Sequence, residues 1–161
     1  MNTITIPIEV ELTPRSKAVM DALYRTLDQK FQDASPGTPA AVSLQPGERY
    51  AGVVLDADGK TMHHLVLLPQ RPDEKLDWQD AMDWATSVGG FLPTRQEQAL
   101  LFANCKPHVQ PRWHWSCEKH ETDASYAWGC LFYTGYQTSN RKSFEGSAVA
   151  VRYIKIGGGN G

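Results

Sequence analysis

Histidine and cysteine side chains recur at a spacing of three in one stretch, at His114, Cys117 and His120. Zinc and copper accept imidazole nitrogen and thiolate sulfur as ligands. The spacing lacks the paired knuckle of structural zinc sites, and on a strand it sends neighbouring side chains to opposite faces. The trio, with His63 and His64 as further donors, is therefore a weak metal candidate. The alternative is loop histidines beside a buried thiol, and we expect no metal and no cofactor.

Thiol chemistry is the second possibility, with Cys117 and Cys130 as its candidates. A reactive cysteine needs exposure and a lowered pKa, which Lys119 or His120 could supply. The alternative is a packing role for a small buried side chain. The third cysteine, Cys105, makes the count odd, which argues against a disulfide framework. We expect no catalytic residue.

A third group of side chains fits recognition. Between Tyr126 and Phe144 the sequence places aromatic, amide and cationic groups on loops punctuated by glycine. Tyrosine and arginine are enriched where proteins bind proteins, because they combine large contact area with directed hydrogen bonds. The alternative is a solvated loop whose aromatic rings pack inward. The candidate partner-binding residues are Tyr133, Tyr136, Gln137, Asn140, Arg141 and Lys142.

An N-terminal arm, residues 1–45, precedes the segment that carries these groups. Apolar residues alternate over residues 3–12, which predicts a strand, and Pro7 favours an edge position for it. An amphipathic helix is predicted over residues 14–32, followed by a linker rich in proline and glycine. Because the apolar faces of the arm must be buried, and an exposed edge strand invites pairing, we predict a homodimer with the arm in its interface.

The main domain, residues 46–156, must position the candidate groups. Thr94 and Glu97 have the spacing of a capping box and predict the start of a helix. The expected elements are a hairpin of strands at 49–55 and 61–68, helices after Asp77 and Thr94, short strands between 105 and 146, and a last strand at 148–156. Residues 157–161 are expected to be a disordered tail.

Composition excludes several classes of protein. The 161-residue chain has a net charge of −2, unlike strongly basic nucleic-acid-binding proteins, so nucleic acid is not an expected partner. No apolar run reaches the length of a membrane span, and the residues after Met1 lack the charged start and apolar core of a signal peptide, so we expect none. We expect a cytoplasmic protein without a membrane partner.

Four short motifs of the main domain recur together in a known family. They are Gly89-Gly90-Phe91-Leu92-Pro93-Thr94 with Glu97, Trp115-Ser116-Cys117, Ala127-Trp128-Gly129-Cys130-Leu131-Phe132, and Val149-Ala150-Val151-Arg152. In order and rough spacing they resemble the C-type-lectin-like domain of small phage and prophage proteins. The same domain, of unassigned function, forms the C-terminus of a bacterial collagen-like adhesin and is related in fold to formylglycine-generating enzymes. The chain departs from the usual family sequences at Gly90-Phe91 and at Cys117.

The resemblance implies an α+β fold with two helices on small antiparallel sheets, the first and last strands paired, and long loops that form the binding surface. It also implies structural roles for the motif residues. Trp115 and Trp128 are expected to fill the core, and Arg152 to anchor a loop. The expected structural residues are Leu92, Pro93, Thr94, Glu97, Trp115, Trp128 and Arg152.

These expectations combine into one functional hypothesis and two alternatives. The hypothesis is a non-enzymatic module of phage or prophage type that recognises a host or phage protein through its loop face. The first alternative is a metal- or thiol-dependent enzyme related to formylglycine-generating enzymes. The second is a structural or receptor-binding component of a virion, which would place the protein in the virion and not only in the cytoplasm of the host cell.

Overall fold

A computed structural model describes residues 18–19, 21–23, 25 and 42–156 of the chain. The first six of these residues are helical, in agreement with the helix predicted over residues 14–32. They belong to one compact unit, Met1–Gly37, and residues 42–156 to a second, Thr38–Gly161. The strand predicted at residues 3–12, the linker and the tail at 157–161 lie outside the described residues. The second unit is described from here on.

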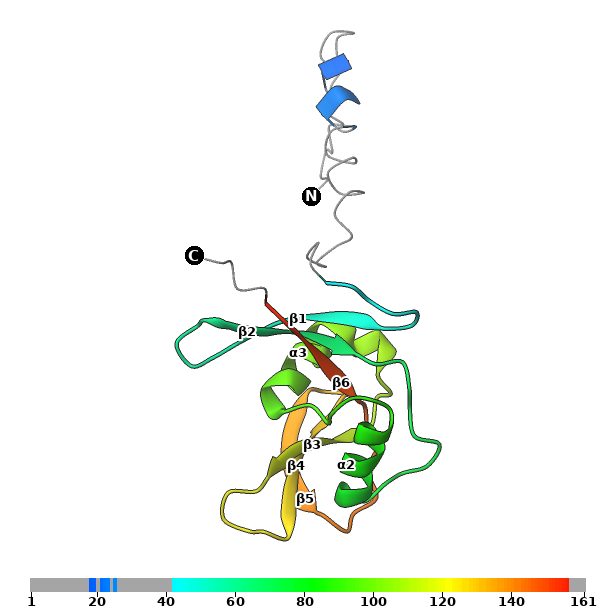
Figure 1. The fold of residues 1–161 in the computed structure, drawn as a ribbon, viewed down its shortest axis with the longest axis vertical. Coiled ribbons are helices and arrows are strands. Elements are labelled where there is room, and N and C mark those ends of the chain that lie inside the picture. The colour runs from blue at the N-terminus through cyan, green and yellow to red at the C-terminus, as the bar shows by residue number, and fades with distance from the viewer. Residues whose placement is uncertain (1–17, 20, 24, 26–41, 157–161) are drawn as a thin grey trace, which may run out of the picture. The chain divides into compact units, whose positions relative to one another are not determined.

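Two antiparallel sheets of three strands and two helices make up this unit (Figure 1), so the α+β class is confirmed. The first sheet has the order β1-β2-β6, with β1 at Arg49–Leu55, β2 at Thr61–Leu67 and β6 at Val151–Lys155. The second has the order β3-β4-β5, with β3 at Trp113–Lys119, β4 at Tyr126–Leu131 and β5 at Tyr136–Arg141. The helices are α2 at Trp78–Ser87, α3 at Arg95–Cys105 and the short 3₁₀ turn η1 at Lys106–His108. None of the described helices is both long and apolar enough to cross a membrane.

The helix starts predicted from the sequence are confirmed. Asp77 caps α2 by accepting a hydrogen bond from the backbone N–H of Asp80 at 2.9 Å. At α3 the Thr94 hydroxyl accepts from Glu97 N, and the Glu97 carboxylate accepts from Thr94 N at 2.9 Å, which completes the capping box. After α2, Gly89 turns the chain with a φ of 82°, a value that glycine adopts without strain.

The core consists of two clusters that meet around α3. The first joins α3 to both sheets, through Leu101 of the helix, Leu65 of β2 and Phe132 at the end of β4. The second lies under α2 and includes Trp78 and the fully buried Trp115, whose ring N–H donates to Leu76 O at 2.9 Å. In Figure 1 α3 lies close to the first sheet, and α2 lies beside the second. Because α3 packs on both sheets, it fixes the position of each relative to the other.

The expected pairing of the first and last strands is wrong for the described strands. The last strand, β6, pairs with β2, and Val151 lies opposite Leu67. On its other edge β6 is occupied by Phe91, because Phe91 and Val151 exchange two backbone hydrogen bonds of 2.9 Å. The outer edge of β1 meets α3 side chains instead, since the Asn104 amide donates to Ala51 O at 2.6 Å. The first strand is therefore held by a helix where the prediction placed another strand.

Candidate functional site

Two exposed tyrosines project from the turn that joins β4 to β5. Tyr133 is 69% exposed and Tyr136 is 66% exposed, the highest values among the large apolar side chains described. The turn between them rests on α3: a Cβ atom at Gly135, whose φ is 81°, would lie 2.9 Å from the Phe102 ring. The Lys106 ammonium also donates to Tyr133 O at 3.1 Å. The backbone of this turn is thus fixed while its two tyrosine rings face solvent.

Gln137, the next candidate along β5, is engaged within the fold. Its side-chain amide donates to Arg95 O at 2.6 Å and accepts from Arg95 Nε at 3.2 Å. The Arg95 guanidinium in turn lies 3.7 Å from the ring centroid of Trp128. Trp128, expected in the core, is instead half-buried, because its position on β4 faces the start of α3 and not the apolar clusters. Its ring N–H donates to the exposed Glu121 carboxylate at 3.2 Å.

The remaining three candidates lie at the opposite end of β5. The Asn140 side chain accepts from Arg141 N at 3.0 Å, the Arg141 guanidinium lies 5.8 Å from the Tyr126 ring, and the Lys142 ammonium lies 4.6 Å from the Trp78 ring. Side chains alternate between the two faces of a strand, so Tyr136 and Asn140 also face away from Gln137 and Arg141. The structure therefore brings Tyr133 and Tyr136 together and does not gather all six candidates on one surface.

The Leu92-Pro93-Thr94 motif connects α2 to α3 and lies against the second sheet. Leu92 is 1% exposed, and Pro93 O accepts a hydrogen bond from Cys117 N at 2.9 Å. Glu97 is 2% exposed, and its carboxylate contacts His63 Nε2 at 3.0 Å and the Tyr153 hydroxyl at 3.4 Å, in addition to its capping bond. Glu97 thus joins the start of α3 to both β2 and β6, a role that its place in the capping box did not reveal.

Arg152 holds the segment that leads into β1. Its guanidinium contacts both carboxylate oxygens of Glu48, at 2.7 and 2.6 Å, and donates to Ser43 O at 2.9 Å. The Glu48 side chain is 5% exposed, and the hydrogen bond from Arg152 holds the pKa of its carboxyl below the usual range. Arg152 is therefore the ion-pair partner of a buried carboxylate.

The cysteines do not form a reactive pair. Cys130 packs in the cluster that includes Leu101, whereas Cys117 packs against the cluster under α2, and both thiols are free. Burial, aided by the nearby carboxylates of Glu97 and Glu118, raises the pKa of Cys117 to about 11. Burial alone raises the pKa of Cys130 to about 11. A thiolate nucleophile needs the opposite shift.

The three candidate metal ligands are separated in space by the register of β3. His114 is buried and donates from Nδ1 to Arg112 O at 2.9 Å, since a carbonyl oxygen only accepts. The ring of His120 stacks on Trp128, with centroids 5.6 Å apart. Cys117 lies between them in sequence and packs elsewhere. Within the described part of the chain no group of three or more histidine, cysteine or acidic side chains could hold a metal ion.

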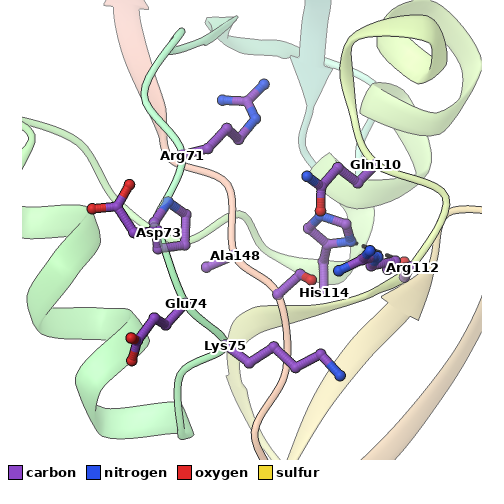
Figure 2. Close-up of a pocket in the computed structure, with 10 residues that line it drawn as sticks. Arg71, Asp73, Glu74, Lys75, Gln110, Arg112, His114 and Ala148 are labelled. Carbon is purple, nitrogen blue, oxygen red and sulfur yellow. Dashed lines mark hydrogen bonds between the residues drawn. The ribbon is translucent and has the colours of Figure 1, made fainter.

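One further site was not predicted from the sequence. His114 lines a pocket of about 140 Å³ with polar and charged neighbours (Figure 2). The pocket is assembled from the loop before α2, the loop before β3 and the segment around Ser147. Its contributors are widely separated in sequence and share no motif. The sequence offers one indication that His114 is buried, which is its position between the large apolar residues Trp113 and Trp115.

No protein-family model matches the chain, and no curated protein matches it. What the chain binds must therefore be inferred from its own residues.

Proposed function

We propose that this chain is a non-enzymatic recognition module that binds a partner protein through the tyrosine pair Tyr133 and Tyr136. The observation that carries the proposal is their exposure, 69% and 66%, on a turn that packs on Phe102 of α3 and accepts a hydrogen bond from Lys106 of η1. A tyrosine ring gives large contact area and a hydrogen-bonding hydroxyl while immobilising few rotatable bonds. A fixed backbone lowers the ordering entropy that binding must overcome. Both features favour protein recognition.

The partner-binding surface is completed by β5, which has no strand on its outer side among the described residues. Exposed edge strands are ready sites for another chain. Gln137, on the opposite face of β5, supports this surface through its hydrogen bonds with Arg95, and Asn140, on the same face as Tyr136, lies toward its rim, while the tyrosines form its centre. A central aromatic pair with a polar rim is the usual arrangement of energetically important interface residues.

The family behind this proposal is the C-type-lectin-like domain of phage and prophage proteins, with a host or phage protein as the partner. Its support is the set of four motifs together with an α+β unit of two helices and two small antiparallel sheets. In that reading the protein acts in the host cytoplasm or as part of a virion. The chemistry of the thiols favours binding over the enzymatic alternative, because burial suppresses the thiolate form of Cys117 and Cys130.

The test is affinity capture with the full chain, the double variant Tyr133→Ser/Tyr136→Ser and the control Phe91→Ser. Phe91 is a suitable control because it is another exposed aromatic, at 55%. Truncation of two central tyrosines should weaken binding of a captured partner at least about tenfold. Surface substitutions change stability by only about 0.5 kcal/mol, so urea denaturation should find the double variant folded. A partner captured equally by wild type and a folded double variant contradicts the proposal.

We further propose that the full chain is a homodimer assembled through residues 1–45. The support is the alternating apolar pattern of residues 3–12, which must be buried against protein. Light scattering at micromolar concentration should give twice the 18.0 kDa of one chain. The variant Ile6→Asp places a charge on the apolar face and should give the monomer mass. A wild-type monomer would refute this assembly.

A further inference from the structure

The pocket beside His114 presents a hydrogen-bond acceptor with no partner. His114 is 1% exposed, and its Nδ1–H is used by Arg112 O. Burial lowers the pKa of the ring to about 4, so Nε2 is unprotonated at neutral pH and can only accept. No described residue donates to Nε2. Since His114 lines the pocket, this acceptor is open to a ligand, and a ligand hydroxyl can donate to it there.

A second polar group without a partner lies next to this imidazole. The backbone of Ser147 is paired with β3 on either side of His114, since Ser147 N donates to Trp113 O and Ser147 O accepts from Trp115 N, both at 3.0 Å. The side chain of Ser147 also lines the pocket, and no described residue bonds its hydroxyl. The hydroxyl and the imidazole thus offer one donor and two acceptor sites side by side.

Cationic side chains surround the same pocket without acidic partners. Lys75 and Arg112 line it, and no described carboxylate lies within ion-pair distance of either. Arg71 adds a third positive charge, but its guanidinium donates to Leu68 O, Gln70 O and His108 O at 2.6 to 2.9 Å. Arg71 therefore contributes charge and structure, while Lys75 and Arg112 have donors free for an anion.

Two carboxylates also border the pocket, and their direction decides the sign of its interior. Figure 2 shows the carboxylates of Asp73 and Glu74 on the side away from His114, whereas the Lys75 and Arg112 side chains extend on the side of the imidazole. Asp73, Glu74, Lys75 and Arg112 are all exposed and screened by water to a similar degree, so the direction of each side chain decides which charges lie nearest His114. The part of the pocket nearest His114 is therefore positive.

The size of the pocket limits the ligand. An apolar cavity of about 150 Å³ holds a molecule of the size of benzene, which has six heavy atoms. A pocket of about 140 Å³ thus suits a ligand of six to eight heavy atoms. Among the described residues, two cations without acidic partners, an imidazole nitrogen without a donor and a serine hydroxyl without a partner line this pocket. We infer that the pocket binds a small hydroxylated carboxylate. The ligand carboxylate contacts Lys75 and Arg112, and a ligand hydroxyl donates to His114 Nε2.

This site is independent of the proposed tyrosine surface. It is formed by loops on the far side of β3 from β5, and none of its residues belongs to the β4–β5 turn. The double variant Tyr133→Ser/Tyr136→Ser should consequently bind the small ligand as wild type does. Failure of one proposal leaves the other standing.

The experiment is a nuclear magnetic resonance titration of the full chain with glycerate, which has one carboxylate and two hydroxyls. Propionate supplies the carboxylate without hydroxyls, and glycerol supplies hydroxyls without the carboxylate. Glycerate should shift the His114 ring nitrogen and the Ser147 amide saturably, and should bind at least about fivefold more tightly than either reference compound. Equal affinity for glycerate and propionate, or no saturable shift at these residues up to about 50 mM glycerate, overturns the inference.

Variants separate the two halves of the recognition. Lys75→Gln/Arg112→Gln changes two exposed side chains and should weaken glycerate binding at least tenfold, whereas the control Lys60→Gln, which removes one charge on the β1–β2 turn, should leave the affinity unchanged. Ser147→Ala should weaken glycerate severalfold without affecting propionate. The control removes one positive charge and the double variant two, so a loss of binding free energy in Lys60→Gln half as large as in the double variant would reduce the effect to net charge and would contradict the site.

Discussion

The buried imidazole of His114 should make the stability of the fold depend on pH above the range in which carboxylates titrate. Its pKa falls from the ordinary value of 6.5 to about 4, mainly because burial disfavours the charged ring. A group that binds its proton more weakly in the folded state leaves the unfolded state with more bound protons between these two values. The free energy of unfolding is therefore at its full value above pH 6.5 and decreases as the pH falls toward 4.

The magnitude follows from the two pKa values. Between pH 7 and pH 5 His114 should remove about 2 kcal/mol of unfolding free energy, and the full loss below pH 4 approaches about 3 kcal/mol. Carboxylates contribute later: the pKa of Glu48 is lowered by Arg152, and its contribution is lost only as the pH falls below about 4.5. The change in unfolding free energy between pH 7 and pH 5 therefore reports the titration of histidine.

Urea denaturation at pH 7, 6, 5.5 and 5 measures this dependence, with His114→Asn as the comparison. The asparagine amide can replace the Nδ1–H donation to Arg112 O but does not titrate. The variant loses ring contacts and should be less stable at every pH, so the informative quantity is the change with pH. The other four histidines remain in both proteins, and the difference between the two curves reports His114 alone. Parallel curves, or a directly titrated His114 pKa near 6.5, would refute the reasoning.

Three further predictions test the packing, the ion pair and the thiols. Gly129→Ala would place a Cβ 2.4 Å from an indole carbon of the neighbouring strand and 2.5 Å from a backbone oxygen, so thermal and urea unfolding should show a loss of about 3 kcal/mol. Arg152→Ala leaves the buried Glu48 carboxylate without its partner and should cost about 3 kcal/mol by urea denaturation, whereas a loss below about 0.5 kcal/mol would mean that the carboxylate is solvated. At pH 8 the native thiols Cys117 and Cys130 should react with an aromatic disulfide at least about 100-fold more slowly than in urea, because their raised pKa values leave little thiolate; equal rates would contradict the burial of both.

Local signals in the sequence were sufficient to place the helices and most strands. The capping residues Asp77 and Thr94 bond backbone groups within one helical turn, so their role can be predicted from the sequence without tertiary information. The first hairpin followed from alternation and from the turn at Gly59, whose φ is 77°. The last strand begins at Val151, later than the predicted residue 148, because residues 148–150 are buried like a strand but lie beyond the β2–β6 register, where Leu68 N donates to Ala150 O at 2.9 Å. Apolar composition alone does not distinguish these two situations.

Long-range contacts explain what the sequence could not predict about the sites. Tyr133 and Tyr136 were candidates because of their residue type, and their position in a turn left them exposed. Gln137 was a candidate for the same reason, but its partner Arg95 lies 42 residues away and nothing local marks the contact. His114 was considered only as a weak candidate for a metal ligand, whereas burial makes it a neutral acceptor in a pocket formed by distant loops. Residue type indicated which side chains could take part in binding or chemistry. Only the tertiary structure determined which neighbours each side chain contacts.

The polar residues of α3 account for the rigidity that both proposed sites need. Gln98, fully buried, donates to His114 O and Trp115 O, and so holds β3 where the pocket meets the sheet. Arg95 at the start of the helix holds β5 through Gln137, in the strand that follows the tyrosine turn. A helix that only packed an apolar stripe would leave these strands free to slide in register. Directed hydrogen bonds from one helix to the strands of the second sheet fix them instead, so the proposed tyrosine surface and the proposed His114 pocket are held by the same element.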